Sequence, residues 1–235
     1  MEGNTIQVNF GKPMPLFPLP NVVMLPHGIQ HLHIFERRYR QMIQHALDQA
    51  GQFAIAAIAG DDPESDVEDD SPELRSAVCV TQVMQHHRFP DGRYNVIVLG
   101  ICRAQIAQID EPEGDRLYRL AKLRLLDRAD SIEADLSDER AELRHLLNSP
   151  RLQTLRGVTK VRQLLEREDV PTNALIELVG SALLEDPEVR YALLAEPAPQ
   201  RRAAIIQREL RSMDAVIRAA QWQMNAGWPK GMSWN

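Results

Sequence analysis

The hydrophobic residues of this chain change their spacing near residue 128, and no other feature constrains the fold as much. Before that point they form short runs of strand length, such as residues 53–59, bounded by proline, glycine and acidic residues. After it they recur every three or four residues, as on one face of a helix. We therefore predict an α+β protein in which a β domain, residues 1–128, precedes an all-α helical bundle, residues 129–235.

The first region is expected to hold several strands and a single helix. Prolines confine the apolar run at 22–25 to a strand end or an edge, and Pro90-Asp91-Gly92 predicts a hairpin turn. The apolar spacing within residues 36–49 predicts the helix, which Gly51 would end. This content favours a barrel-like sheet whose strands cover residues 15–19, 53–59, 77–89, 93–109 and 118–126.

The second region is predicted to form four or five helices. Ser137 and Thr172 are candidate N-caps, and Asp186-Pro187 places a cap before a proline at the first helical position. A shorter helix is expected at residues 158–165. The last helix is expected at about 199–222. One of its faces is apolar and consists of Ile205, Ile206, Met213, Val216, Ile217 and Ala220.

Composition narrows the classes of function. A formal net charge of −6 argues against a general nucleic-acid binder, which needs an excess of lysine and arginine. Cys79 and Cys102 lie in strand-like runs and are interpreted as buried thiols in a reducing cytoplasm. No secretory signal opens the chain, and no apolar run approaches the about 20 residues that span a bilayer. We expect a soluble, cytoplasmic protein without membrane contact.

Residues 61–73 are dominated by aspartate and glutamate, interrupted by Pro63 and Pro72. Such a segment buries too little apolar surface to offset its ordering entropy, so we expect a solvated loop, whose role the sequence leaves open. Binding of a calcium ion by these carboxylates is an alternative role for the segment. The segment, however, lacks the alternating acids and the glycine of a calcium loop.

Residues 15–39, PLFPLPNVVMLPHGIQHLHIFERRY, carry a family resemblance. Their proline-bounded apolar runs, followed by Leu32-His33-Ile34-Phe35-Glu36 and Arg38-Tyr39, resemble the start of the N-terminal substrate-binding domain of the Lon ATP-dependent proteases. The Pro-Asp-Gly-Arg turn at residues 90–93 and the helical segment at 174–202 resemble later parts of the same domain. Departures fall at His27, His31 and Arg37, where this family usually has glycine, proline and proline.

The resemblance implies a PUA-like barrel followed by a helical bundle, and a non-enzymatic module that binds exposed apolar segments of client polypeptides. It implies a stand-alone form of the domain, since the ATPase and peptidase domains of a Lon protease have no counterpart in this sequence. A separate ATP-dependent protease is a candidate partner. The alternative is a PUA-like module that binds a small molecule or a nucleic acid.

Enzyme signatures are missing from the sequence. It contains no phosphate-binding loop, no Gly-x-Ser-x-Gly elbow and no His-Glu-x-x-His motif, so a remnant hydrolase is the least favoured reading and no cofactor is expected. His27, His31 and His33, with His86 or His87, could form a zinc or nickel site. His86 and His87 point to opposite faces of a strand, however, so ordinary surface histidines are favoured and no metal is expected.

The candidate contacts for a client lie on the first loop and the helix after it. The residues we name are Met24, Leu25, His27, Ile29, His31 and Tyr39. All three tryptophans fall within the last fourteen residues, and tryptophan is enriched at interaction hot spots. Two roles are open for Trp222, Trp228 and Trp234. They either cover the bundle or bind a partner, and a second copy of this chain is one candidate partner.

Overall fold

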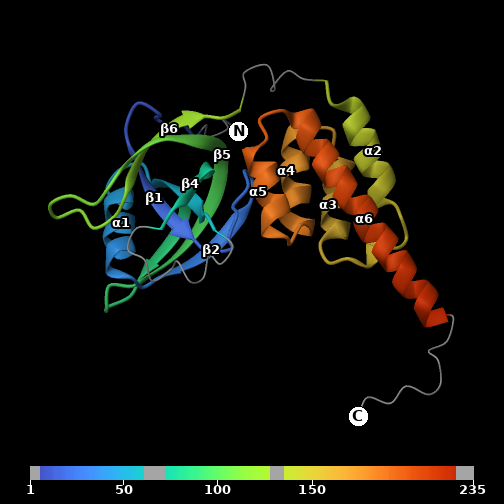
Figure 1. Ribbon diagram of the computed structural model, residues 1–235, viewed down its shortest axis with the longest axis horizontal. Coiled ribbons are helices and arrows are strands. Elements are labelled where there is room, and N and C mark those ends of the chain that lie inside the picture. Colours follow the sequence, from blue (N-terminus) through green and yellow to red (C-terminus); the bar gives the residue numbers. More distant parts are fainter. Residues whose placement is uncertain (1–5, 61–71, 128–134, 226–235) are drawn as a thin grey trace, which may run out of the picture.

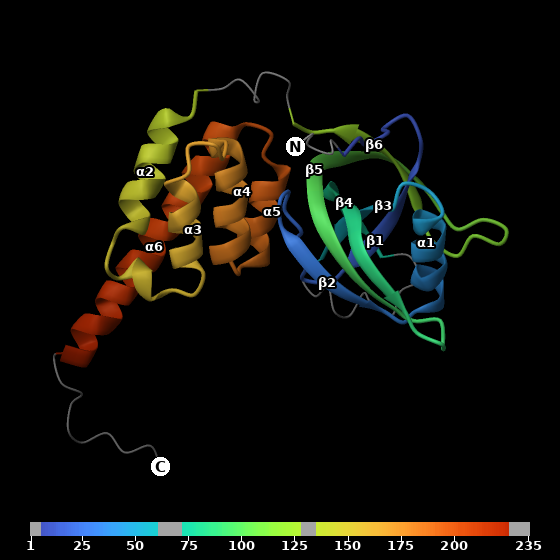
Figure 2. The same ribbon diagram turned by 180° about the vertical axis from the view of Figure 1, so that it is seen from behind.

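Figure 1 shows the computed structural model, which describes residues 6–60, 72–127 and 135–225, with side chains up to residue 222. A sheet with one helix forms one half of the molecule, and a group of helices forms the other. Both views place the two halves side by side (Figures 1 and 2). The predicted α+β order, strands first and helices second, is therefore confirmed.

A barrel-like sheet dominates the first half. Its strands lie in the order β2-β5-β4-β3-β1-β6, and β6 also pairs with β5, which closes a ring of five strands and leaves β2 attached to β5. The long β5 serves both neighbours, because its first part pairs with β2 and its last part with β6. The strands are β1 Met14–Leu19, β2 Ile29–Ile34, β3 Gln52–Ile58, β4 Leu74–Arg88, β5 Tyr94–Asp110 and β6 Leu120–Leu125.

Strand β3 is buried on both of its faces. Its side chains alternate between two buried clusters, with Phe53 and Ile55 in one and Ala54 and Ala56 in the other. Both faces of the strand are thus covered by apolar side chains. This arrangement explains the continuous hydrophobic run that predicted a buried strand.

Helix α1 (Arg37–Leu47) covers one side of the sheet. Tyr39, Met42, Ile43 and Ala46 are buried, as their helical spacing predicts. Glu36 is the N-cap, and its carboxylate pairs with Arg38 at 2.9 Å. The tight turn after the helix requires Gly51, whose φ of 70° is unfavourable for other residues.

The second half is built from helices that pack through apolar faces. They are α2 Ser137–Leu147, the short 3-10 helix Leu152–Thr154, α3 Val158–Leu165, α4 Thr172–Leu183, α5 Pro187–Ala195 and α6 Pro199–Asn225. Asp186 caps α5 as predicted, because its side chain accepts hydrogen bonds from the backbone of Glu188 and Val189. Ser137 and Thr172 are instead the first helical residues, and neither helix has a side-chain cap.

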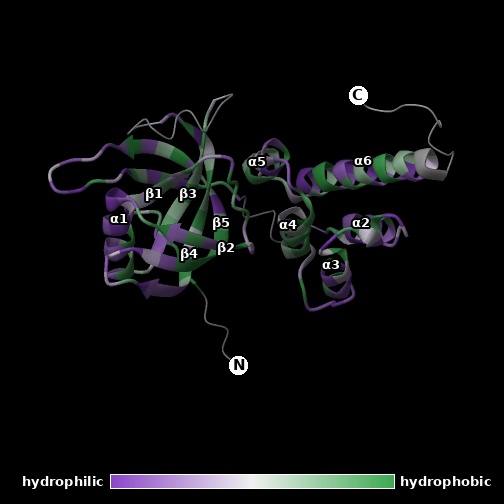
Figure 3. Ribbon diagram, turned by 90° about the horizontal axis from the view of Figure 1, so that it is seen from below, coloured by the Kyte–Doolittle hydropathy of each residue, from purple (hydrophilic) through white to green (hydrophobic). Residues whose placement is uncertain are grey.

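The end of α6 projects beyond the other helices (Figures 1 and 2). Its first part is buried through Ala203, Ile206 and Leu210. Val216 and Trp222, in contrast, are 66% and 72% exposed. The predicted helix is confirmed, and its apolar face is covered by the bundle only in its first part. Figure 3 shows hydrophobic and hydrophilic residues alternating along the helix. Trp228 and Trp234 lie outside the described residues.

The two halves share one buried cluster. It runs from Phe17 and Phe53 in the sheet through Leu25 to Leu193 and Ile206 in the helices. Helix α5 also lies against β4, where the backbone N–H of Ala77 donates to the Tyr191 hydroxyl at 3.0 Å. A division of the chain at residue 128 stays a prediction, because apolar packing is continuous across the junction.

Candidate functional site

The first loop, which precedes β2, forms part of the junction between sheet and helices. Met24 and Leu25 are 5% and 1% exposed, and Leu25 packs against Gly180 of α4. The loop passes so close to β5 that a Cβ atom on Gly100 would overlap the carbonyl oxygen of Leu25. This burial corrects the expectation that Met24 and Leu25 are surface contacts, because a client cannot reach them in this conformation.

Tyr39 is also buried, at 7% exposure, with its ring edge-on to Phe17 at a centroid distance of 4.6 Å. Its role here is to pack α1 onto the sheet, so it too is not a surface contact. His27 is exposed and has a φ of 61°, a value that explains why glycine suits this position. The surrounding protein desolvates the His27 imidazole and lowers its pKa.

The outer face of β2 carries the exposed residues of the predicted set. Ile29 is 64% exposed, and His31 and His33 follow on the same face because side chains alternate along a strand. Phe35, which directly follows the strand, is 62% exposed. None of these four side chains is an acid, a lysine or an arginine. We call them the β2 surface; the sequence analysis missed Phe35, although an aromatic next to a strand end was visible in it.

The histidines near the β2 surface make ordinary contacts. His33 Nδ1 lies 2.7 Å from Asn95 Oδ1, and its ring stacks at 6.2 Å on Phe35. His87 stands edge-on to Phe89 at 4.8 Å. Within residues 6–60, 72–127 and 135–225 no group of three or more histidine, cysteine, aspartate or glutamate side chains is arranged to hold a metal ion.

An apolar pocket opens at the end of β2, between that strand and the end of β1. Its volume is about 250 Å³. Glu36 and Arg38 lie at its rim, and His33 and Phe35 join it to the β2 surface. Small-molecule sites usually enclose about 300–1,000 Å³, so this size fits an amino-acid side chain better than a cofactor. The remaining lining is apolar apart from Tyr39: Phe17, Pro18, Leu19, Pro20, Ile34, Ile58 and Pro72.

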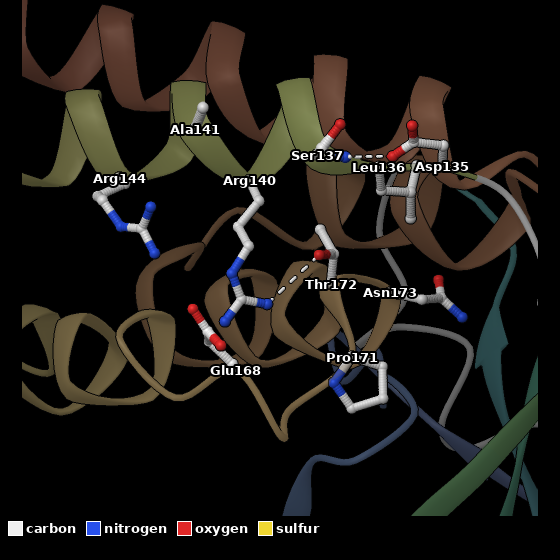
Figure 4. Close-up of a pocket in the computed structure, with 10 residues that line it drawn as sticks. All are labelled: Asp135, Leu136, Ser137, Arg140, Ala141, Arg144, Glu168, Pro171, Thr172 and Asn173. Atoms are coloured by element: carbon white, nitrogen blue, oxygen red, sulfur yellow. Dashed lines mark hydrogen bonds between the residues drawn. The ribbon is translucent and has the colours of Figure 1, made fainter.

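A more polar pocket lies between α2 and the start of α4, with a volume of about 500 Å³ (Figure 4). Arg140 crosses it and donates to the carbonyl oxygens of Val170, Leu165 and Arg167 at 2.9, 2.9 and 2.6 Å. Arg144 donates to the Leu165 carbonyl at 3.1 Å. These guanidinium groups hold the end of α3 in place, so the pocket is not our candidate binding site.

A buried ion network joins the sheet to the helices, and the sequence analysis did not identify it. The Glu177 carboxylate of α4 lies 2.6 Å from Arg103 of β5 and 2.8 Å from Arg202 of α6. Asp127 adds a second carboxylate, 2.6 Å from Arg103. Both arginines are at most 1% exposed. Glu177 is therefore held between two guanidinium groups and sealed from solvent.

The charges of this network shift two guanidinium pKa values in opposite directions. Burial by itself lowers the pKa of Arg103, but Glu177 and Asp127 outweigh it, and that pKa is raised. Burial and the positive charge of Arg103 lower the pKa of Arg202. An arginine stays charged in proteins even so, because its ordinary pKa lies far above neutrality. The sequence gives no local sign of this network, because its members lie far apart in the chain.

The two cysteines are poor nucleophiles. Cys79 is buried, as predicted, and burial raises its thiol pKa. Cys102 is half-buried, and burial together with the charge of Asp127 raises its pKa to about 11. Across the described helices, moreover, none is long and apolar enough to cross a membrane.

The comparison with protein families decides the assignment. Residues 13–212 match the family model described as the ATP-dependent protease La (LON) substrate-binding domain. The chain belongs to this family. The resemblance seen at residues 15–39 is thereby confirmed, and the match is to the substrate-binding domain and not to a peptidase domain.

Three Lon proteases illustrate the sequence relationship. The chain is 26% identical over 170 residues to the Bacillus thuringiensis protein, 25% over 104 to that of Xanthomonas oryzae, and 28% over 101 to that of Desulfovibrio desulfuricans. The matches cover 71%, 43% and 43% of this chain. They span only 19%, 12% and 11% of the lengths of those proteins.

Two solved structures share the fold of this Lon substrate-binding domain. The N-terminal domain of Mycobacterium avium complex Lon protease aligns with a TM-score of 0.62 at 19% identity, over 87% of this chain and 98% of that one. The Lon N-terminal domain protein from Xanthomonas campestris aligns with a TM-score of 0.57 at 21% identity, over 81% and 94%. The predicted barrel-like sheet followed by helices is therefore the arrangement of Lon N-terminal domains.

Proposed function

We propose that this Lon substrate-binding domain is a non-enzymatic module that binds exposed apolar segments of unfolded or partly folded polypeptides. The site is the β2 surface together with the apolar pocket at its end. The observation that carries the proposal is the continuity between them: His33 and Phe35 belong to both. An extended chain crossing β2 would meet exposed apolar side chains first and an apolar recess next.

Exposure supports this choice of surface. Ile29 and Phe35 are each more than 60% exposed, on β2 and directly after it. Exposed apolar side chains along one strand are a common sign of an interaction surface. Fully burying a large apolar side chain is worth about 1.5–3 kcal/mol, so a few such contacts give weak, reversible binding. Weak binding of this kind suits a module that must accept many client sequences.

The family supports the polypeptide as ligand, because its description names a substrate-binding domain of an ATP-dependent protease. Delivery of bound clients to a separate ATP-dependent protease is part of the proposal. No metal, cofactor or covalent step is needed for the binding itself. The half-buried or buried state of both thiols fits a binding role better than a catalytic one.

The test is a fluorescence-anisotropy titration with a labelled, permanently unfolded polypeptide, with its folded form as the control ligand. We expect saturable binding of the unfolded form only. The Ile29→Asp/Phe35→Asp variant should weaken it by about tenfold or more, because a buried charge replaces two apolar contacts. Val216→Asp, an equally exposed position on α6, should leave binding unchanged. Equal loss in both variants, or no binding by the unmodified protein, would contradict the proposal.

A further inference from the structure

A second depression, which we call the basic groove, lies on the other side of the start of α1. It has a volume of about 530 Å³ and runs between α1, the β4–β5 hairpin and the segment at residues 114–117. Arg37, Arg40 and Arg88 line it, and Asp115 is its single acidic residue. This concentration of positive charge is unusual in a chain whose net charge is −6.

The arginines of the basic groove have donors to spare. Neither Arg37 nor Arg88 forms an ion pair with a carboxylate of the described residues, and both are exposed. Arg88 only approaches the Tyr94 ring, at 5.8 Å. Arg40 donates to a neutral acceptor, the backbone carbonyl of Asp91, at 2.8 Å. The guanidinium groups of Arg37 and Arg88 are therefore available for an acidic group of a bound polypeptide, whereas Arg40 also interacts electrostatically with the Asp91 carboxylate.

The basic groove and the apolar pocket meet at the first turn of α1. Glu36 and Arg38 line the pocket, whereas Arg37 and Arg40 line the groove. Because these residues are neighbours in the chain, one extended peptide can reach both depressions. At about 3.3–3.6 Å per residue, a separation of a few residues in the peptide is enough.

We infer that the polypeptide segments bound by this domain carry an apolar anchor followed or preceded, a few residues away, by acidic side chains that contact Arg37, Arg40 and Arg88. The inference rests on the proposed function, because it assigns the charge of the client. Arginine suits this role, since its planar fork matches the two oxygens of a carboxylate. A nucleic acid needs an extensive basic surface, which a chain of net charge −6 does not favour, whereas a few carboxylates of a polypeptide need only a local group of arginines.

The experiment compares two labelled peptides that share one leucine-rich anchor and differ in a flanking run of glutamate or of glutamine. The glutamate peptide should bind about tenfold more tightly, from two or three exposed charge pairs. Its advantage should shrink at about 1 M ionic strength, where the Debye length falls to about 3 Å. Arg37→Glu/Arg88→Glu should remove the advantage and leave the glutamine peptide unaffected. Arg124→Glu/Arg156→Glu, which changes two exposed arginines outside the groove, is the control with the same change in net charge and should keep the advantage.

The outcomes separate this inference from the proposed function. Equal affinity for the two peptides would overturn the acidic preference and leave polypeptide binding intact. Failure of both peptides to bind would overturn the proposed function. A competition experiment tests the alternative ligand, a single-stranded oligonucleotide. If the oligonucleotide displaces the labelled glutamate peptide at a lower concentration than the unlabelled glutamate peptide does, the basic groove is reassigned to nucleic acid. Loss of the advantage in Arg124→Glu/Arg156→Glu as well would show a general effect of net charge and no specific site.

Discussion

Glu177 offers the sharpest test of how the two halves of the molecule are held together. Its carboxylate is 2% exposed and lies between Arg103 and Arg202, which come from the sheet and from α6. Glu177→Gln keeps the shape of the side chain and removes its charge. The two guanidinium groups then share only the Asp127 carboxylate, which is 23% exposed and 3.7 Å from Arg202.

Glu177→Gln should lower the free energy of unfolding strongly, because a buried charge without its partner is unfavourable. Removing one member of a buried ion pair typically destabilises a protein by about 3–5 kcal/mol. Domains are stable by about 5–15 kcal/mol in total, so a third or more of the free energy of unfolding is at stake. Glu188 pairs with Arg75 at a similar distance, 2.6 Å, but is 74% exposed. Glu188→Gln should therefore lose less than about 1 kcal/mol.

Urea denaturation followed by circular dichroism measures both variants against the unmodified protein. A second variant, Glu177→Leu with Arg103→Met and Arg202→Met, should recover much of the loss, since an apolar replacement of a buried ion network is often neutral. Two results would refute the reasoning: a loss below about 1 kcal/mol in Glu177→Gln, or equal losses in Glu177→Gln and Glu188→Gln. Either would mean that the network contributes no more than a surface pair.

Three further predictions follow from single residues. Gly100→Ala should destabilise the protein by about 2 kcal/mol or more in the same denaturation assay, because the new Cβ would overlap the Leu25 backbone. Gly11→Ala, at an exposed turn, is the control for this substitution. Cys79 should resist maleimide labelling at about pH 8 until the chain unfolds, because its raised pKa keeps the thiol protonated. Cys102, with a pKa of about 11, should react only slowly. Rapid modification of Cys79 in the folded protein would contradict this prediction. The folded pKa of His27 lies below the ordinary 6.5, so the unfolded chain binds this proton more readily and stability should fall as the pH drops below 6.5. His27→Asn should reduce that fall, and an unchanged pH profile of the free energy of unfolding would argue against it.

The junction has a consequence for how this Lon substrate-binding domain works. Strand β5, α4 and α6 meet at the ion network, and the first loop packs with α4 and α6 in a continuous apolar cluster. A client on the β2 surface would therefore bind next to a fixed helical support. The buried ion pairs of Glu177 with Arg103 and Arg202 join the sheet to α4 and α6 and favour one arrangement of the two halves.

The sequence was sufficient for the elements and for much of the packing. The continuous apolar run at 53–59 and the helical spacing within 36–49 are local patterns, so they predicted β3 and α1 to within one or two residues of the observed 52–58 and 37–47. The cap of α5 was equally local, because Asp186 contacts backbone groups two and three residues away. The starts of α2 and α4 were predicted one residue late, because Ser137 and Thr172 are residue types typical of an N-cap but here occupy the first helical position.

The sequence by itself determined the order of strands and helices, the family and the apolar character of the first loop. Only the tertiary structure decided which of those apolar residues face solvent. Met24 and Leu25 are covered by α4, whereas Ile29 and Phe35 are not, and no local pattern distinguishes them. The same holds for Arg103, Glu177 and Arg202, because their pairing depends on packing between segments about 25 to 100 residues apart in the sequence. Burial and ion pairing at a junction are properties of long-range contacts, which periodicity and composition do not encode.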